Sequence, residues 1–415
     1  MKHAHLIETL PSLSFLRSKI YGNKLSALQI EKIISDITLG KYSAVQISAF
    51  LTACASSHLD EDEIFYLTKA MIKMGEKINW HKAMIVDKHS IGGIPGNRTT
   101  PIIVAIVAAY GLTMPKTSSR AITSPAGTAD TMEVLTEVDL NIEKIQKIVA
   151  QENACIVWGG SSSLSPTDDI LIHVERELNL DSEEQMVASI LSKKIAAGSN
   201  HILIEIPTGK TAKVRNKKTA LLLQKLLEKI GKKLGVKVKA LITDGSQPIG
   251  RGIGPALEAR DLVAVLKNDK NAPQDLRNHA LNLAAEILEF SPEIKKGSGK
   301  IIAKKILDSG KAWEKFQAIC EAQGGLKKIP QAKYVEEILA QKSGMISEID
   351  NRQIAILAKL AGAPFDRVAG IDLYVKTGQK IKQNQVLFAI HSQSKNLLKN
   401  ALNFCADNSQ LIQIK

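Results

Sequence analysis

The 415-residue sequence has little of what marks a secreted, membrane-spanning or zinc-bound protein. Its four cysteines lie far apart and show no CxxC spacing, which argues against a zinc site and a disulfide framework. No stretch of 18 apolar residues occurs, and residues 1–12 lack the apolar core of a signal peptide. We therefore expect a cytoplasmic protein.

Aromatic residues make up only 4% of the chain, and no run of five or more like charges appears. The 55 Lys and Arg against 42 Asp and Glu leave a net charge of +13, with lysines spread in pairs such as Lys217-Lys218 and Lys232-Lys233. A shortage of aromatics argues against binding of single-stranded nucleic acid by base stacking. We interpret the charge as a solvated, lysine-rich surface and expect small-molecule partners, with neither nucleic acid nor a membrane.

The length predicts two or three domains, and the first 80 residues predict helices. Ser26 and Gln29, and likewise Ser43 and Gln46, have the spacing of a capping box ahead of an apolar-periodic run. Asp60 is predicted to cap a third helix.

From residue 83 the pattern changes to strands that alternate with helices. The segments 83–87, 113–118, 155–158, 202–206 and 236–243 predict strands, and the runs 100–110, 128 onward, 216–234, 253–267 and 273–290 predict helices. Such alternation predicts a largely parallel sheet covered by helices. Residues 370–391 alternate apolar and polar positions, which predicts a small β-rich module.

The first loop, DKHSIGG at residues 87–93, contains the parts of an anion site. Gly92 and Gly93 allow the backbone to approach a ligand, Lys88 supplies a positive charge and Ser90 a hydroxyl. The helix that follows directs its positive end toward the loop. The alternative is a helix cap with a surface lysine. The loop is not a Walker A motif.

The second loop, SSRAITSPAGTAD at residues 118–130, has five hydroxyls, one arginine and one glycine between a strand and a helix. Hydroxyls and backbone amides surround phosphate without covalent chemistry. A merely polar connection is the alternative interpretation.

These two loops, together with SILSKK at residues 189–194, resemble the thymidine phosphorylase and pyrimidine-nucleoside phosphorylase family. The longer runs DKHSIGGIPGNRTT and SSRAITSPAGTADTMEV resemble its AMP phosphorylase branch. The resemblance extends from about residue 12 to the C-terminus. Members of that branch usually carry an additional domain ahead of the helical one, whereas this sequence starts at the helical segments.

The resemblance implies an α/β protein in which a small all-helical domain faces a large α/β domain with a mixed or parallel sheet across a cleft, followed by a smaller C-terminal α+β domain. We expect the helical domain at residues 1–80, completed by 165–197. The phosphate-binding α/β domain then spans 81–164 and 198–330, and the C-terminal domain spans 331–415. The family further implies a homodimer. It implies no metal and no cofactor, since inorganic phosphate is a substrate.

The resemblance also implies roles for individual residues, carried over by matching position. The phosphate-binding positions are Lys88, Ser90, Thr99 (with Thr100 as its alternative), Ser118 and Thr128. The positions that match nucleotide- or nucleoside-binding residues are Gly93, Ser119, Arg120, Ala121, Ile122, Thr123, Ser124, Thr128, Ser189, Lys193 and Lys213. Asp181 matches the proton donor of the AMP branch and His89 a base-side histidine, so the expected catalytic residues are Asp181, His89 and Lys88.

One position departs from the thymidine enzymes. They carry a base-binding arginine fifteen residues before the first serine of SILSKK, where this chain has Val174, with Arg176 two residues later. Valine cannot replace an arginine in bidentate recognition of a pyrimidine. We therefore expect phosphorolysis of a nucleoside 5′-monophosphate such as AMP, giving free base and ribose 1,5-bisphosphate. The alternatives are a thymidine or pyrimidine-nucleoside phosphorylase giving (deoxy)ribose 1-phosphate, a phosphoribosyltransferase of the anthranilate type, and a non-catalytic nucleotide-binding protein.

Overall fold

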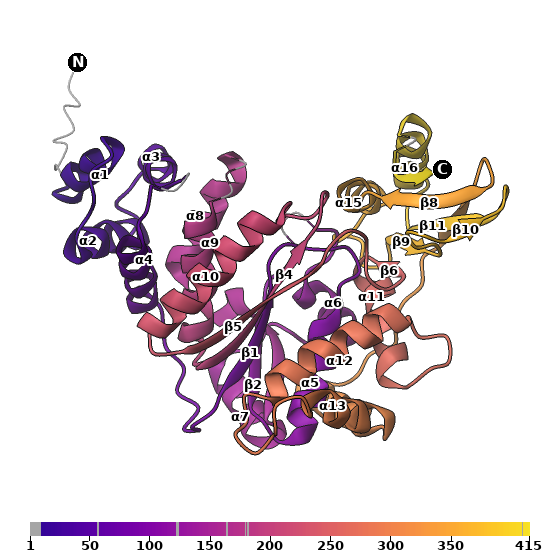
Figure 1. Ribbon diagram of the computed structural model, residues 1–415, viewed down its shortest axis with the longest axis horizontal. Helices are drawn as coiled ribbons and strands as arrows, with labels where there is room; N and C mark the ends of the chain where they lie inside the picture. The colour runs from indigo at the N-terminus through magenta and orange to yellow at the C-terminus, as the bar shows by residue number, and fades with distance from the viewer. Residues whose placement is uncertain are drawn as a thin grey trace. The chain divides into compact units, whose positions relative to one another are not determined.

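The computed structural model describes residues 10–55, 58–121, 124–162, 165–178, 180, 182–408 and 410–415. The chain divides into two compact units (Figure 1). The first unit comprises residues 1–80, 163–200 and 222–238, and the second comprises residues 81–162, 201–221 and 239–415.

The first unit is built from helices. They are α1 (Ser12–Ile20), α2 (Ala27–Thr38), α3 (Ala44–Cys54), α4 (Glu61–Met74), α8 (Pro166–Leu178), α9 (Glu183–Ala196) and residues 222–233 of α10 (Lys217–Lys233). The α4 helix packs against both α2 and α9 through a buried apolar face that includes Ile64, Leu67 and Met71. The predicted capping boxes of α2 and α3 are confirmed, as is the cap of α4 at Asp60.

A buried ion pair ties α1 to the start of α4. Lys19 Nζ lies 2.7 Å from Glu63 Oε1, and the two side chains are 1% and 2% exposed. The same Oε1 accepts the Leu25 amide at 3.0 Å, while Oε2 accepts the Asp60 amide at 3.2 Å. Glu63 therefore closes the cap of α4 and neutralises a buried ammonium at the same time.

The second unit contains the parallel strands. The strands that alternate with its helices are β1 (Val86–Ser90), β2 (Met114–Ser118), β3 (Ala154–Trp158), β4 (His201–Thr208) and most of β5 (Lys237–Asp244), with strand order β1-β4-β5 in one sheet and β2-β3 in another. The β1–β4 and β2–β3 pairs are parallel, and a parallel bridge between Ile85 and Thr113 links the two sheets. The predicted parallel pairing is confirmed.

Our prediction placed the first strand three residues too early in the sequence. We expected a strand at 83–87 followed by a loop, whereas β1 runs from Val86 through Lys88 to Ser90. The charged Lys88 stays inside the sheet because Glu205 on the neighbouring β4 neutralises it.

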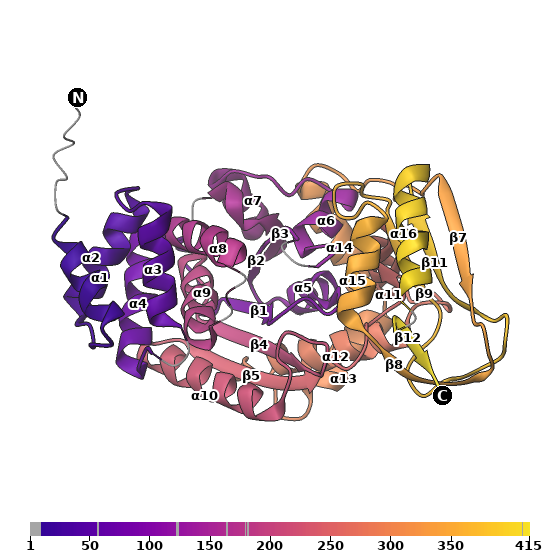
Figure 2. The same ribbon diagram turned by 90° about the horizontal axis from the view of Figure 1, so that it is seen from above.

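Helices cover the sheets of this unit. They are α5 (Thr99–Tyr110), α6 (Thr128–Leu135), α7 (Ile142–Glu152), α11 (Pro255–Leu266), α12 (Gln274–Leu288), α13 (Gly299–Asp308) and α14 (Lys311–Ala322), with a short 3-10 turn at Gly159–Ser162. The α5 helix is apolar on every side and buried throughout residues 99–108, so it forms the centre of the core. It packs against α11, α12, α13 and α14 (Figure 2).

The C-terminal part of the second unit has antiparallel sheets and a core of its own. Its elements are β6 (Gly252–Ile253), β7 (Tyr334–Leu339), β8 (Gly344–Ile349), α15 (Asn351–Leu360), β9 (Gly370–Leu373), β10 (Lys380–Ile381), β11 (Val386–Ser392), α16 (Lys395–Asp407) and β12 (Ile412–Ile414). The sheets have the orders β6-β9-β11-β7 and β10-β8-β12. Since Ile253 pairs with Ile371 in a strand, our predicted helix 253–267 begins two residues later, at Pro255.

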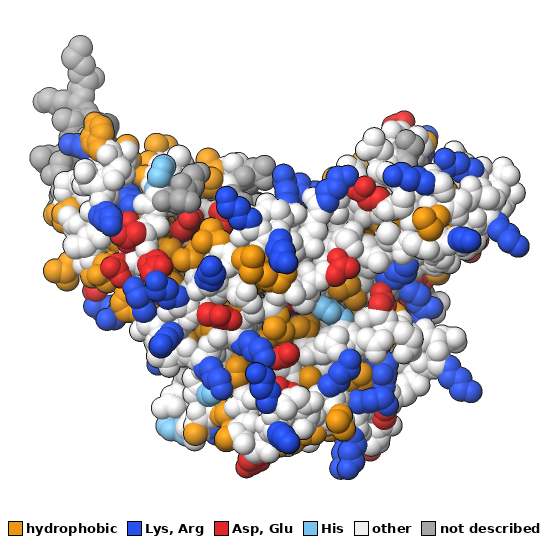
Figure 3. All heavy atoms as spheres, viewed as in Figure 1, with side chains coloured by type: hydrophobic (Ala, Val, Ile, Leu, Met, Phe, Trp, Pro, Cys, Tyr) orange, Lys and Arg blue, Asp and Glu red, His pale blue; other side chains and the backbone are white. Residues whose placement is uncertain are grey.

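The surface carries charges of both signs. Figure 3 shows Lys and Arg side chains interspersed with Asp and Glu on the visible face, as expected of a solvated, lysine-rich surface. Within the described part of the chain, no helix combines the length and the apolar character needed to cross a bilayer.

The Lys19–Glu63 pair generates a stability prediction. Glu63→Gln leaves the buried Lys19 ammonium without its counter-charge, so we expect the free energy of unfolding to fall by about 3–5 kcal/mol. Urea unfolding followed by circular dichroism measures it. The control is Glu61→Gln on the same helix, because Glu61 pairs with Lys229 at the exposed surface and its loss should change stability by less than about 1 kcal/mol. Equal effects of the two substitutions would refute the role of burial.

Candidate functional site

Lys88 lies at the centre of a polar cluster in the second unit. Its Nζ is 2.7 Å from Ser90 Oγ, 3.1 Å from Thr99 Oγ1 and 2.9 Å from Glu205 Oε2. Alternation along β1 places Lys88 and Ser90 on one face of the strand and His89 on the other. Thr99 begins α5, so the helix directs its positive end to the cluster. Of the two candidate threonines, Thr99 supplies the hydroxyl that contacts Lys88.

Glu205 is the acidic centre of this cluster and is fully buried. It accepts hydrogen bonds from Ser90 Oγ, from Thr243 Oγ1 at 3.2 Å and from Asn97 Nδ2 at 3.4 Å, and it faces His279 Nε2 at 2.5 Å. Burial alone would raise the pKa of Glu205, but the charge of Lys88 and the contact with His279 hold it well below its usual range. The carboxylate is therefore ionised.

We did not identify Glu205 or His279 from the sequence. The available signal was a lone carboxylate within the apolar run ILIEI at residues 202–206, since a buried charge requires a partner. His279 gave no signal, because its partner lies 74 residues away.

The glycine-rich loop brings three of the predicted nucleotide-binding residues together. A Cβ atom on Gly93 would lie 2.8 Å from Ser124 Cβ, and one on Gly92 would lie 2.6 Å from Lys213 Cβ. Gly92 also has a φ of +75°, which favours glycine. The first loop thus packs directly against the second loop and against the connection between β4 and α10, where the exposed Lys213 lies.

Arg98, which we did not single out from the sequence, joins the second loop to the start of α5. Its guanidinium donates to Thr128 Oγ1 at 3.0 Å, to the Ala126 carbonyl at 2.9 Å and to Glu258 Oε2 at 2.6 Å. Burial raises the pKa of Glu258, and the charge of Arg98 opposes that shift. Thr99 contacts Lys88, and the adjacent Arg98 contacts Thr128. The start of α5 therefore positions predicted phosphate-binding residues of both loops.

The remaining residues of the second loop mostly shape it. Asp130 Oδ2 accepts the amides of Ala121 at 2.6 Å and Gly127 at 2.8 Å. Arg120 forms a bidentate pair with Glu133 at 2.7 and 2.9 Å, so a carboxylate of the following helix α6 neutralises its charge.

Two hydroxyls complete what the structure describes of this loop. Ser119 is exposed. Ser118 Oγ is buried and has no hydrogen-bond partner among the described residues, so a ligand or water can hydrogen-bond to it. Ile122 and Thr123 lie outside the described residues.

The first unit holds a second cluster of predicted residues. Lys193 Nζ lies 2.6 Å from Asp168 Oδ2 and 3.1 Å from Ser189 Oγ, which joins α9 to α8. Val174 on α8 is 8% exposed, whereas Arg176 is exposed. Two residues apart on a helix do not share a face, so Arg176 does not take the place of Val174. Asp181 lies outside the described residues.

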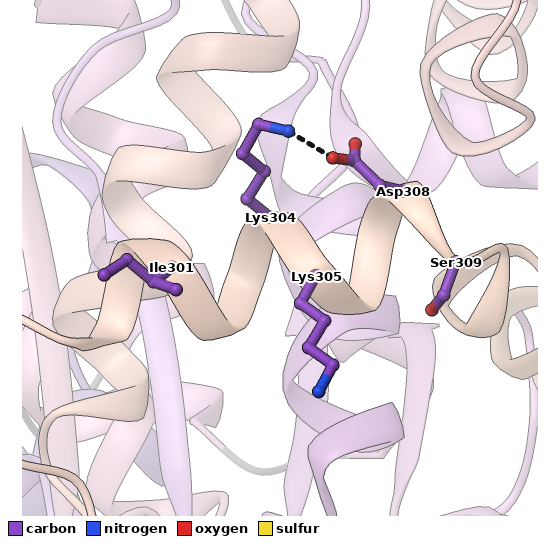
Figure 4. Close-up of a pocket in the computed structure, with 5 residues that line it drawn as sticks. All are labelled: Ile301, Lys304, Lys305, Asp308 and Ser309. Atoms are coloured by element: carbon purple, nitrogen blue, oxygen red, sulfur yellow. Dashed lines mark hydrogen bonds and ion pairs between the residues drawn. The ribbon is translucent and has the colours of Figure 1, made fainter.

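A shallow depression of about 490 Å³ on α13 is unrelated to these clusters. It is lined by Ile301, Lys304, Lys305, Asp308 and Ser309. Figure 4 shows Lys304 paired with Asp308 along the helix while Lys305 points away from them. These are solvated surface residues, and none of them matches a position predicted for the site.

Family models match three parts of the chain. Residues 13–75 match the helical bundle domain of the glycosyl transferase family, and residues 82–313 match its α/β domain. Residues 345–411 match the pyrimidine nucleoside phosphorylase C-terminal domain.

Relatives cover nearly the whole chain. A putative thymidine phosphorylase of Legionella pneumophila (strain Corby) is 56% identical over 97% of this chain and 78% of that protein. One from Hahella chejuensis is 52% identical over 97% of this chain and 80% of that protein. Anthranilate phosphoribosyltransferase from Thermus thermophilus has the same fold with 16% identity and a TM-score of 0.61, over 74% of this chain and 98% of that one.

The Lys88–Glu205 pair makes stability depend on pH. Because the pKa of Glu205 is lower in the folded chain than in the unfolded one, its contribution is present above about pH 4.3 and is lost as the pH falls below that value. Lys88→Met removes the main cause of the lowered pKa. We expect this variant to be less stable than wild type by about 3–5 kcal/mol at pH 7, and the gap to narrow toward pH 3.5.

Urea unfolding at both pH values checks this expectation. The control is Lys239→Met, since Lys239 forms a more exposed pair with Glu286 and its loss should have a small effect at pH 7. If wild type and Lys88→Met differed in free energy of unfolding by the same amount at both pH values, Lys88 would not be the cause of the lowered pKa of Glu205.

Proposed function

The chain belongs to the thymidine and pyrimidine-nucleoside phosphorylase family of pentosyltransferases, and on that basis we propose that it cleaves a nucleoside 5′-monophosphate such as AMP with inorganic phosphate. The products are the free base and ribose 1,5-bisphosphate.

We propose that phosphate binds beside the Lys88 cluster. The ammonium of Lys88, the hydroxyls of Ser90, Thr99 and Thr128, and the positive end of α5 support an anion there. Ser118 Oγ, which is buried and has no hydrogen-bond partner among the residues that the structure describes, adds a further hydroxyl that can bind a phosphate oxygen. A phosphate oxygen so held attacks C1′ of the pentose as the bond to the base breaks, and positioning of this kind removes several kcal/mol of barrier.

The leaving base needs a proton. The transition state has oxocarbenium character, so negative charge develops on the base nitrogen as the glycosidic bond breaks. We propose that Asp181 donates the proton, with Ser189 and Lys193 contacting the base and His89 lying on the base side. No covalent enzyme intermediate is needed, and no cofactor beyond phosphate as the second substrate.

Val174 is the reason why we propose a nucleoside 5′-monophosphate rather than a pyrimidine nucleoside as the substrate. A buried valine occupies the position of the pyrimidine-binding arginine, and the nearby Arg176 is exposed on another face of α8. Lys213 and Ser124, which pack against the glycine loop, are the residues we propose for the 5′-phosphate, because ammonium and hydroxyl groups suit a dianion.

We further propose that the protein is a homodimer and that it is cytoplasmic.

The second candidate is a thymidine or pyrimidine-nucleoside phosphorylase. The match of residues 345–411 to the pyrimidine nucleoside phosphorylase C-terminal domain favours it, as do the names of the relatives. The two candidates share the chemistry at C1′ and differ in the base and in the requirement for a 5′-phosphate.

Chromatography of the released base separates the candidates. The purified chain is incubated with phosphate and with AMP, CMP, UMP, thymidine or uridine in turn, and each is repeated without phosphate. We expect phosphate-dependent base release from a monophosphate at a kcat/KM at least tenfold above that for thymidine. Release from thymidine and from no monophosphate would rule out our first choice in favour of the second.

Substitution of the proposed proton donor provides a test of mechanism. We expect Asp181→Asn to lower kcat by about 10²–10⁴-fold, with substrate affinity little changed, because only the proton transfer is lost. Steady-state kinetics and substrate binding by calorimetry measure the two effects. The control is Asp139→Asn at an exposed position of the other unit. A kcat within twofold of wild type for Asp181→Asn would show that another group donates the proton.

A further inference from the structure

A buried carboxylate stands inside the proposed phosphate site. Glu205 is fully buried, and its Oε2 contacts both Lys88 and Ser90, two of the groups that we propose for the anion. A carboxylate beside a bound oxyanion repels it, and the repulsion is strong where water is excluded. Glu205 neutralises the buried Lys88, and through its contact with Ser90 it also sets the hydrogen bonds that the site offers to an anion.

The hydrogen bonds show what Glu205 does to its neighbours. An ionised carboxylate only accepts, so the single hydroxyl hydrogen of Ser90 is donated to Glu205. Lys88 Nζ already donates to Ser90 Oγ at 2.7 Å, which leaves that oxygen one lone pair for a ligand. Thr99 also accepts from Lys88, and its own hydrogen is directed to Asn97 Oδ1 at 3.2 Å. Ser90 is the hydroxyl whose hydrogen is held by a charged acceptor, so it offers a ligand a lone pair rather than a hydrogen.

The groups around Glu205 keep this arrangement in place. Thr243 and His279 contact Oε1, the oxygen that Ser90 does not use, and Asn97 Nδ2 lies 3.4 and 3.5 Å from the two carboxylate oxygens. These contacts come from the residue two positions ahead of α5, from β5 and from α12, so the carboxylate cannot turn away without losing several of them. Ser90 therefore keeps its hydrogen directed at Glu205 when a ligand arrives.

We propose that Glu205 makes the anion site selective for an oxyanion that carries a proton. Phosphate is protonated at least once near neutral pH and can donate that hydrogen to the free lone pair of Ser90 Oγ. Arsenate belongs to the same chemical class. Sulfate has the same shape and no proton, so it would set lone pair against lone pair, a mismatch that weakens binding by a factor of about 10–100. This inference rests on the proposed function, because it takes phosphate as the second substrate.

Calorimetry on the full chain tests the inference without any nucleotide. Phosphate and sulfate are titrated at pH 7 and equal ionic strength into wild type, Glu205→Gln and a control, Glu286→Gln, whose native carboxylate pairs with Lys239 elsewhere in the unit. For wild type and the control we expect sulfate to bind at least tenfold more weakly than phosphate. In Glu205→Gln the amide can donate to Ser90 and release the hydroxyl hydrogen, so the ratio of sulfate Kd to phosphate Kd should fall at least fivefold.

Two results would overturn the inference. One is wild-type binding of sulfate within threefold of phosphate, and the other is full discrimination in a folded Glu205→Gln. If circular dichroism shows that Glu205→Gln does not fold, inhibition of wild-type base release decides instead, since sulfate should compete with phosphate only at tenfold or higher concentration. If sulfate competes as well as phosphate binds while base release still depends on phosphate, the selectivity proposed for Glu205 is wrong and the proposed function stands. Failure of phosphate both to bind and to support base release removes the proposed function as well.

Discussion

The buried ion pair between Lys88 and Glu205 is the interaction on which the site depends. The two side chains come from neighbouring parallel strands, β1 and β4, and both are almost completely withdrawn from water. Either charge alone would be costly at this depth, so each makes the other possible. The pair holds the end of β1 next to the start of α5, which places an ammonium, two hydroxyls and a helix N-terminus around one point.

The same helix start connects the two loops that carry the family's motifs. Thr99 contacts Lys88 of the first loop region, and its neighbour Arg98 donates to Thr128 and Ala126 of the second. Behind both residues, α5 is buried on all sides in the core of the unit. A helix anchored in this way holds its N-terminal groups in fixed positions, which is what catalysis by positioning requires.

Much of the local structure could be predicted because it depends on neighbours in the sequence. The caps at Ser26, Ser43 and Asp60 involve partners two or three residues away, so their spacing was sufficient. The strand β1 was misplaced for the opposite reason. A lysine such as Lys88 indicates a loop when only its sequence neighbours are considered. It can lie in a buried strand because Glu205, 117 positions later, neutralises it.

The sequence by itself determined the family, the order of the helical and α/β segments and the two loops in which phosphate chemistry is expected, since motifs and periodicity are local properties. Only the tertiary structure decided that Glu205 faces the first loop, that His279 contacts Glu205, and that Arg98 joins the start of α5 to the second loop. These contacts span from 28 to 115 positions along the chain. They depend on which strands and helices become neighbours, and no local pattern specifies that. The direction of the Ser90 hydroxyl, and with it the kind of anion the site would accept, is set at that level.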